Sequence, residues 1–173
     1  MTHLLAAALA LQISNFSGAP PSLVLRAQDE VIRVYGEIGV PVEWVGPSDA
    51  ATDHPAAIRI VLLPYETGDL RRSEQLVMGA ATRTPSGTAI AYIFYRRVQA
   101  EAGRYEVSTD VVLACAIAHE VGHLLLPSRA HAPAGLMRAC WRRDEFRRAE
   151  QGQLGFLPDD VARIRAGIRD TDR

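Results

Sequence analysis

Short, nearly continuous runs of apolar residues recur along the first half of the chain. Runs of about four to eight such residues, bounded by glycine, proline or polar residues, are typical of strands buried in a sheet. Five runs predict strands, at residues 9–16, 40–45, 58–63, 76–81 and 88–95. The run at 58–63 is apolar on both faces and is expected at the centre of the sheet, whereas Gly79 interrupts the fourth run and favours an edge position.

Helical spacing of apolar residues marks other parts of the chain. Apolar positions three and four residues apart predict an amphipathic helix, and they run from about residue 22 to 38 and again from 158 through 168. A third, more apolar helix is predicted from 108 to about 126, where a proline ends it. Polar loops are predicted at 46–56 and 64–75.

This order of elements predicts a single α/β domain. A length of 173 residues suits one domain, and a chain of this size can bury a core without disulfides or a partner subunit. We expect a mostly parallel sheet with helices packed against it over residues 1–173, and a C-terminal helical subregion at 138–173 that begins with an irregular stretch.

The composition excludes several classes of function. The formal net charge of -1 argues against a nucleic-acid-binding protein, which needs a basic surplus. Because no apolar run reaches the length of a bilayer span, no membrane-spanning helix is expected. All 19 basic residues are arginine, which excludes a Schiff-base lysine and a P-loop lysine.

The first eight residues are apolar and end in small residues. They are a truncated leader remnant, a disordered end, or plain mature sequence, and a complete secretory leader is disfavoured because no arginine precedes Arg26. The apolar residues at the start of the sequence favour a secreted or periplasmic location for the protein.

The strongest chemical signal lies in the predicted central helix, where residues 119–123 read His-Glu-Val-Gly-His. Residues four apart on a helix project about 40° apart and lie about 6 Å along its axis, so His119 and His123 leave one face and can converge on one ion. Glu120 projects from a neighbouring flank, within reach of a metal-bound water. This geometry is typical of zinc hydrolases, and a hydrogen-bonded histidine pair without metal is the alternative.

A catalytic zinc ion needs a third protein ligand and one open position. In the loop after the helix, the only imidazole or carboxylate belongs to His131, which follows a chain reversal at 127–130. We expect His131 to be the third ligand, with Glu145 or Glu150 as the rival.

These residues resemble the signature of the zincin metallopeptidases, and within them of the metzincins. In that group a third histidine follows the helix motif and a methionine turn lies beneath the metal. Ala134-Gly-Leu-Met137 resembles this turn, with Met137 as its methionine. The gap of eight residues from His123 to His131 is longer than in the group, and Leu126 stands where the group has a glycine.

The resemblance implies a zincin-like fold and a zinc metalloendopeptidase. The fold would be a twisted, mostly parallel five-stranded sheet with an antiparallel edge strand, packed by an N-terminal helix, an active-site helix and a C-terminal helix. One Zn²⁺ on the three histidines would activate a water, with Glu120 as general base. A protein or peptide substrate would lie along the edge strand, at Val77, Met78, Gly79 and Ala80.

The two cysteines and the arginines after Met137 leave alternatives open. Cys115 and Cys140 are expected either to form a disulfide that ties the turn to the helix or to remain two buried thiols, and a cysteine metal ligand is less favoured. The basic cluster is expected to be a solvated face, or else to bind an acidic substrate. Its members are Arg138, Arg142, Arg143, Arg147 and Arg148.

Two other functions compete with a peptidase. One is a zinc hydrolase that acts on a non-protein amide, and the other is a non-catalytic domain with a structural zinc. Glu120 favours an enzyme, because a structural site needs no carboxylate beside an open coordination position.

Overall fold

The computed structural model describes residues 8–46, 57–66, 77–127 and 131–171, with side chains described as far as residue 168. The leader or mature start proposed for the first eight residues lies almost wholly outside this part of the chain. So do most of the loops expected at 46–56 and 64–75, the first residue of the predicted strand at 76–81, and most of the reversal expected at 127–130.

Five strands form one sheet with the order β2-β1-β3-β5-β4. Neighbouring strands run parallel except β4, which pairs antiparallel with β5 at the edge. The strands are β1 (Leu9–Asn15), β2 (Val42–Trp44), β3 (Ile58–Leu63), β4 (Gly79–Arg83) and β5 (Ala89–Phe94). This confirms the predicted mixed sheet with an antiparallel edge strand, and β3 lies in its centre as expected.

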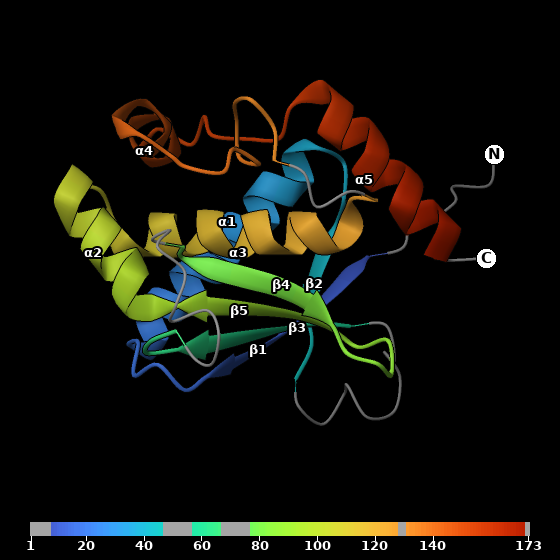
Figure 1. The fold of residues 1–173 in the computed structure, drawn as a ribbon, viewed down its shortest axis with the longest axis horizontal. Helices are drawn as coiled ribbons and strands as arrows, with labels where there is room; N and C mark the ends of the chain where they lie inside the picture. The colour runs from blue at the N-terminus through green and yellow to red at the C-terminus, as the bar shows by residue number, and fades with distance from the viewer. Residues whose placement is uncertain (1–7, 47–56, 67–76, 128–130, 172–173) are drawn as a thin grey trace.

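The described helices lie on one side of the sheet, so the fold is a two-layer sandwich (Figure 1). They are α1 (Pro21–Glu37), α2 (Tyr95–Tyr105), α3 (Thr109–Leu125), α4 (Arg143–Glu150) and α5 (Pro158–Thr171). The α3 helix packs against β4, β5 and the other four helices, and α1 packs against α3 and β2. Because this layer covers one face of the sheet, Ile58, Ile60 and Leu62 are buried whereas Arg59 on the same strand is exposed.

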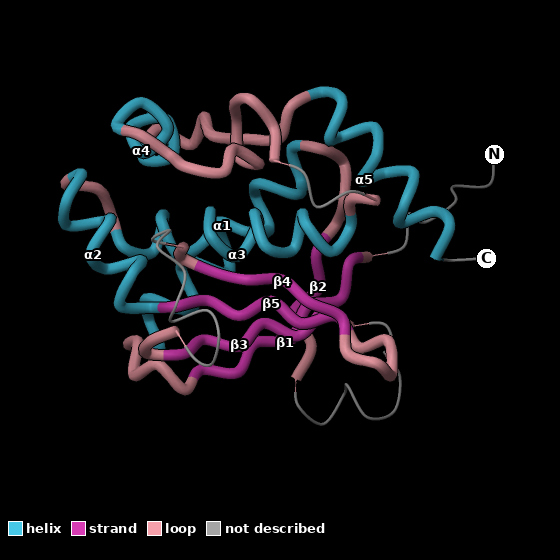
Figure 2. The backbone as a smooth tube through the Cα atoms, in the orientation of Figure 1, coloured by secondary structure: helices cyan, strands magenta, loops and turns pink. Residues whose placement is uncertain are grey.

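Two helices were not predicted individually. The α2 helix follows β5 without a break, and α4 occupies part of the stretch that was expected to be irregular (Figure 2). At the start of α4 the Glu145 carboxylate accepts a hydrogen bond from the Arg142 amide, at 2.8 Å, which satisfies one of the free donors of this helix end. The predicted C-terminal helix is present as α5, which ends three residues later than expected.

The edge strand begins later than its apolar run. Val77 and Met78 precede β4, although the Met78 carbonyl already accepts a hydrogen bond from the Phe94 amide at 2.8 Å. The edge is therefore fixed against β5 from Met78 onward. Within the described residues, no helix has both the length and the hydropathy needed to cross a bilayer.

Candidate metal centre

The α3 helix, which bears His119, Glu120 and His123, is buried inside the protein. Elements pack around it on several sides, so its residues are buried almost without interruption from Val112 to Leu124. Polar side chains in such a helix need partners, because an unsatisfied buried polar group costs about 1–3 kcal/mol. His119 and Glu120 are nevertheless only 8% and 7% exposed.

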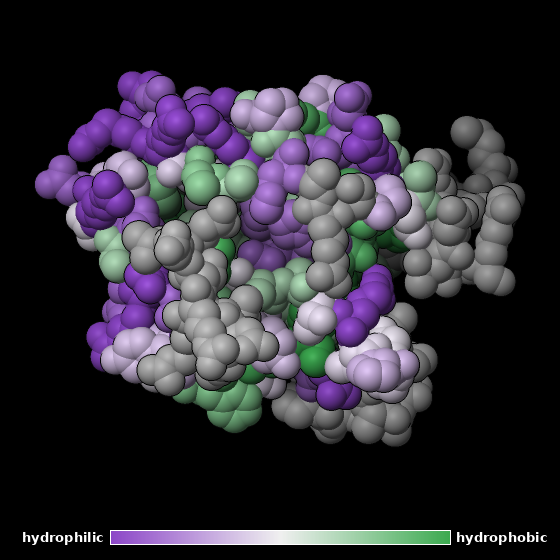
Figure 3. Space-filling model, viewed as in Figure 1, coloured by the Kyte–Doolittle hydropathy of each residue, from purple (hydrophilic) through white to green (hydrophobic). Residues whose placement is uncertain are grey.

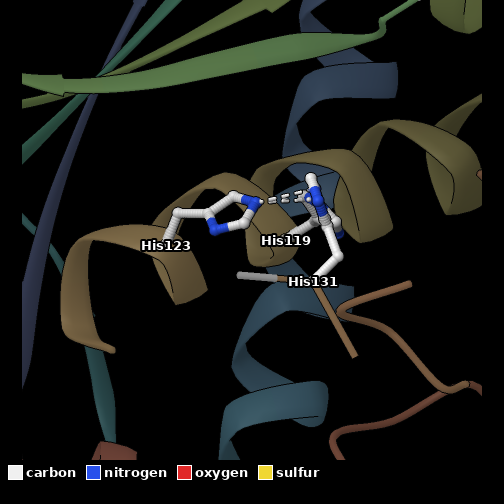
Figure 4. Close-up of side chains that lie close together, drawn as sticks. All are labelled: His119, His123 and His131. Atoms are coloured by element: carbon white, nitrogen blue, oxygen red, sulfur yellow. Dashed lines mark hydrogen bonds between the residues drawn. The ribbon is translucent and has the colours of Figure 1, made fainter. Parts of the chain in front are cut away.

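Three imidazole rings converge at the C-terminal half of α3 (Figure 4). The Nε2 atom of His123 lies 3.0 Å from Nε2 of His119 and 3.2 Å from Nε2 of His131. A ring nitrogen carries either one proton or one lone pair, so His123 Nε2 cannot form both contacts as good hydrogen bonds. Nitrogens that share a tetrahedral zinc ion at 2.0–2.1 Å lie about 3.3–3.4 Å apart. The observed spacing is close to this value, and the three histidines can hold a metal ion.

The orientation of His119 is fixed by the backbone. Its Nδ1 lies 2.7 Å from the Leu136 carbonyl oxygen. A carbonyl only accepts, so Nδ1 carries the proton and Nε2 keeps its lone pair for a metal. Burial lowers the pKa of His119 to about 4, against the opposing effect of the Leu136 hydrogen bond and with a smaller lowering from His131. The ring is therefore neutral at pH 7, as a metal ligand must be.

A tight loop after α3 brings His131 to the other two rings. The Ala132 amide donates to the Met137 carbonyl at 2.9 Å, and Ala132 and Arg138 form a parallel bridge. Gly135 adopts a left-handed conformation with φ 74° at the tip of the loop, which favours glycine there. The loop thus brings His131, the predicted third ligand, beside His119 and His123.

The rival third ligands are engaged elsewhere. Glu145 forms an ion pair with Arg138, whose Nη1 lies 2.5 Å from Oε1. Glu150 accepts a hydrogen bond from the Ser108 amide at 2.9 Å. Among the described residues, the three histidines are the one group of histidine, cysteine or carboxylate side chains able to hold an ion.

Met137 packs directly against α3 between the two helical ligands. It is fully buried, and a Cβ atom added at Gly122 would lie 2.6 Å from its sulfur. Any side chain at position 122 would therefore displace Met137 or the loop that carries it. This contact explains the glycine within the His-Glu-Val-Gly-His segment, because the absence of a side chain there lets Met137 pack against α3.

Glu120 lies against the edge strand. A Cβ atom added at Gly79 would lie 2.7 Å from Cγ and 2.9 Å from Oε1 of Glu120, as well as 2.8 Å from the Tyr92 carbonyl oxygen. Gly79 therefore allows the carboxyl group to approach the backbone of β4. Burial raises the pKa of Glu120 to about 8 in the metal-free protein.

A cavity of about 620 Å³ opens beside the histidines and Glu120. Val77, Met78 and Gly79, three of the residues predicted to contact substrate, line it from the edge. Ala80 does not line it and Ala81 does, because successive residues of a strand face opposite sides. The sequence reasoning did not find Glu101, Arg104 and Tyr105, which α2 contributes to the cavity wall. The spacing of Tyr95, Val98, Ala102 and Tyr105 is the helical signal that would have indicated α2.

The cysteines do not form the predicted disulfide, and both are free. The Cys115 thiol is buried in the core, where burial raises its pKa to about 12, with smaller effects from Glu30 and Arg33 of α1. Cys140 is exposed and lines the cavity on the opposite side of α3 from α1. The two residues occupy different environments, so the alternative of two buried thiols is also wrong for Cys140.

The buried Glu120 carboxyl group should make the stability of the metal-free protein depend on pH. Its folded pKa of about 8 exceeds the ordinary 4.5, so its stabilising contribution is complete below pH 4.5 and is lost as the pH rises to 8. Glu120→Gln removes this dependence. Since one pH unit corresponds to about 1.4 kcal/mol, the variant should gain a few kcal/mol over wild type between pH 5 and 8 in denaturant unfolding with chelator present. Parallel pH profiles of the two proteins would contradict the burial of an ionisable group at this position.

Comparison with known proteins adds no relative to these findings. No protein-family model matches the chain. No curated protein matches it either.

Proposed function

We propose that this protein is a zinc-dependent metallopeptidase with a metzincin-like active site. The observation that carries the proposal is that Nε2 of His123 lies 3.0 Å from Nε2 of His119 and 3.2 Å from Nε2 of His131, beside a buried carboxyl group and an open cavity. Three neutral imidazoles suit zinc, although copper, nickel and iron also accept them. The site fits the ion because His119 is already held in the required tautomer.

A bound zinc ion would supply a Lewis acid for the scissile carbonyl and would lower the pKa of a water toward neutrality. The protein itself positions and transfers the proton. Glu120 follows the first ligand on α3 and lies against Gly79, so its carboxylate is fixed at the boundary between the metal site and the edge strand. It accepts the proton of the attacking water and returns it to the leaving amine.

The edge strand supports a peptide rather than a compact small molecule as substrate. Among the described residues, β4 is paired on one side only, with β5, so its other edge can offer backbone donors and acceptors for strand addition. Three of the four residues predicted to bind substrate, Val77, Met78 and Gly79, line the cavity, and Ala81 of β4 lines it in place of Ala80. An extended peptide on this edge passes the histidines and Glu120.

The direct test is metal analysis followed by hydrolysis of a peptide library. Purified protein should contain one zinc ion per chain and cleave peptides, lose activity with a chelator, and regain it when zinc is restored. Zinc content without peptide cleavage, but with cleavage of a non-protein amide, would move the assignment to that hydrolase class. Tightly bound zinc with neither activity would indicate a structural ion.

A further inference from the structure

The cavity extends from the metal site along a wall of aromatic rings. The Trp141 ring stands edge-on to His119, with 5.8 Å between centroids, and edge-on to Phe146, at 5.9 Å. Phe146 in turn stacks on Tyr105 at 4.3 Å. Trp141, Phe146 and Tyr105 all line the cavity, so its far end lies between α2 and α4.

Arg138 and Arg104 are the two arginines in this wall, and their surroundings differ. Arg138 forms an ion pair with Glu145, whose second carboxylate oxygen accepts a hydrogen bond from the Arg142 amide. The side chain of Arg104 is 64% exposed, and its Nη1 forms only a long ion pair with the Glu101 carboxylate, at 3.9 Å, beyond hydrogen-bond distance. Within the part of the chain that the structure describes, the Arg104 guanidinium makes no hydrogen bond.

The Arg104 guanidinium lies over the ring of Tyr105. The Arg104 Cζ atom lies 5.4 Å from the Tyr105 centroid, within the range of a cation–π contact. A guanidinium has five N–H donors in a planar fork, which matches a carboxylate in a bidentate pair. Glu101 also lines the cavity, and its carboxylate reduces the positive charge around Arg104. Binding of a ligand carboxylate by Arg104 therefore depends on the arrangement of the guanidinium N–H donors as well as on charge.

The predicted basic cluster after Met137 does not supply this function. Arg147 pairs with Asp144 at 3.5 Å and Arg148 donates to the Gln153 carbonyl at 3.2 Å. Of the cluster's five arginines, only Arg138 lines the cavity. Figure 3 shows hydrophilic surface gathered at the end of the molecule that α2 and α4 form. Of the two arginines that line the cavity, Arg104, which is outside the basic cluster, is the one whose N–H donors can bind a ligand.

We propose that Arg104 determines specificity by binding a substrate carboxylate on the α2 side of the scissile bond. Tyr105 and Trp141 would contact the part of the substrate that lies between this carboxylate and the scissile bond. This inference rests on the proposed peptidase function. The carboxylate is either an acidic side chain or the free carboxyl end of a short peptide. Both present the same planar group to the guanidinium, and the experiment separates them.

The test uses quenched peptides of one sequence that carry Glu, Gln or Lys at successive positions after the cleaved bond, each as a C-terminal acid and as an amide. With zinc-loaded wild type, one Glu position, or the free C-terminal acid, should raise kcat/KM about five- to tenfold over its neutral counterpart. Arg104→Gln should reduce this ratio to near one, and Arg104→Glu should shift the preference toward Lys. Because the contact is exposed, 0.5 M salt should also weaken it.

Arg96→Gln is the matched control, because Arg96 is an exposed arginine on the same helix that does not line the cavity. It should keep the wild-type ratio. Cleavage without preference for a carboxylate, or an equal preference in Arg104→Gln, would overturn the inference and leave the peptidase standing.

Binding of Glu- and Gln-bearing peptide hydroxamates to the zinc-loaded protein provides a readout that needs no turnover. If no peptide is cleaved but wild type binds the Glu hydroxamate more tightly, and Arg104→Gln does not, recognition at Arg104 is supported while the peptidase proposal fails. No cleavage together with equal hydroxamate affinities would overturn both.

Discussion

Replacing Glu120 with glutamine should reduce peptide hydrolysis by about 10²–10⁴-fold, the range for loss of a general acid–base group, while zinc remains bound at one ion per chain. Glutamine has nearly the shape of glutamate but cannot accept the proton of the attacking water. It is also the substitution that the site can accommodate, since Gly79 leaves no room for a larger group beside the carboxyl.

The measurement pairs kcat/KM on one peptide with elemental analysis of the same sample. Glu43→Gln is a suitable control, because this glutamate is exposed on β2 at the opposite edge of the sheet. An active Glu120→Gln protein, with more than about a tenth of wild-type turnover, would rule out this carboxylate as the general base.

Removal of a single imidazole should abolish stable metal binding. Loss of a second-shell partner already costs about 10–100-fold in affinity, so His119→Ala and His131→Ala should each weaken zinc binding by more than 100-fold in competition with a chromophoric chelator. The two variants should differ in stability. His119 is buried and hydrogen-bonded to Leu136, whereas His131 is exposed, so only the former should also destabilise the metal-free fold markedly.

Glu43→Gln, a change at the opposite edge of the sheet and outside the three-histidine group, also serves as the control for these titrations. Wild-type zinc affinity in His131→Ala would remove His131 from the ligand set and return the third position to another side chain.

Local geometry made the helical part of the site predictable. Two histidines four residues apart must share a helix face, so the direction of His119 and His123 needed no tertiary information. His131 was predictable because its loop offered no competing ligand. The parallel strands were also readable, since β3 is an apolar run whose bounds match the prediction at 58–63.

Tertiary partners decided what the sequence could not show. Cys115 is on α3 and Cys140 follows Met137 by three residues, so the sequence suggested that they could be close. In the structure Cys115 lies in the core and Cys140 lines the cavity, and no spacing rule predicts these different environments. The short α4 helix is mostly charged, and Phe146 and Ala149 bury its inner side through packing rather than through a long repeat. Arg104 became a candidate only when its partners could be compared with those of Arg138.

The Leu136 carbonyl has a second donor besides His119. The Trp141 indole Nε1 donates to the same oxygen at 3.1 Å, so a single acceptor joins His119 to one of the two tryptophans in the chain. The other, Trp44, is on β2 and donates to the Gln28 carbonyl far from the histidines. We therefore expect zinc binding to the histidines to change the fluorescence of Trp141 and to leave that of Trp44 constant.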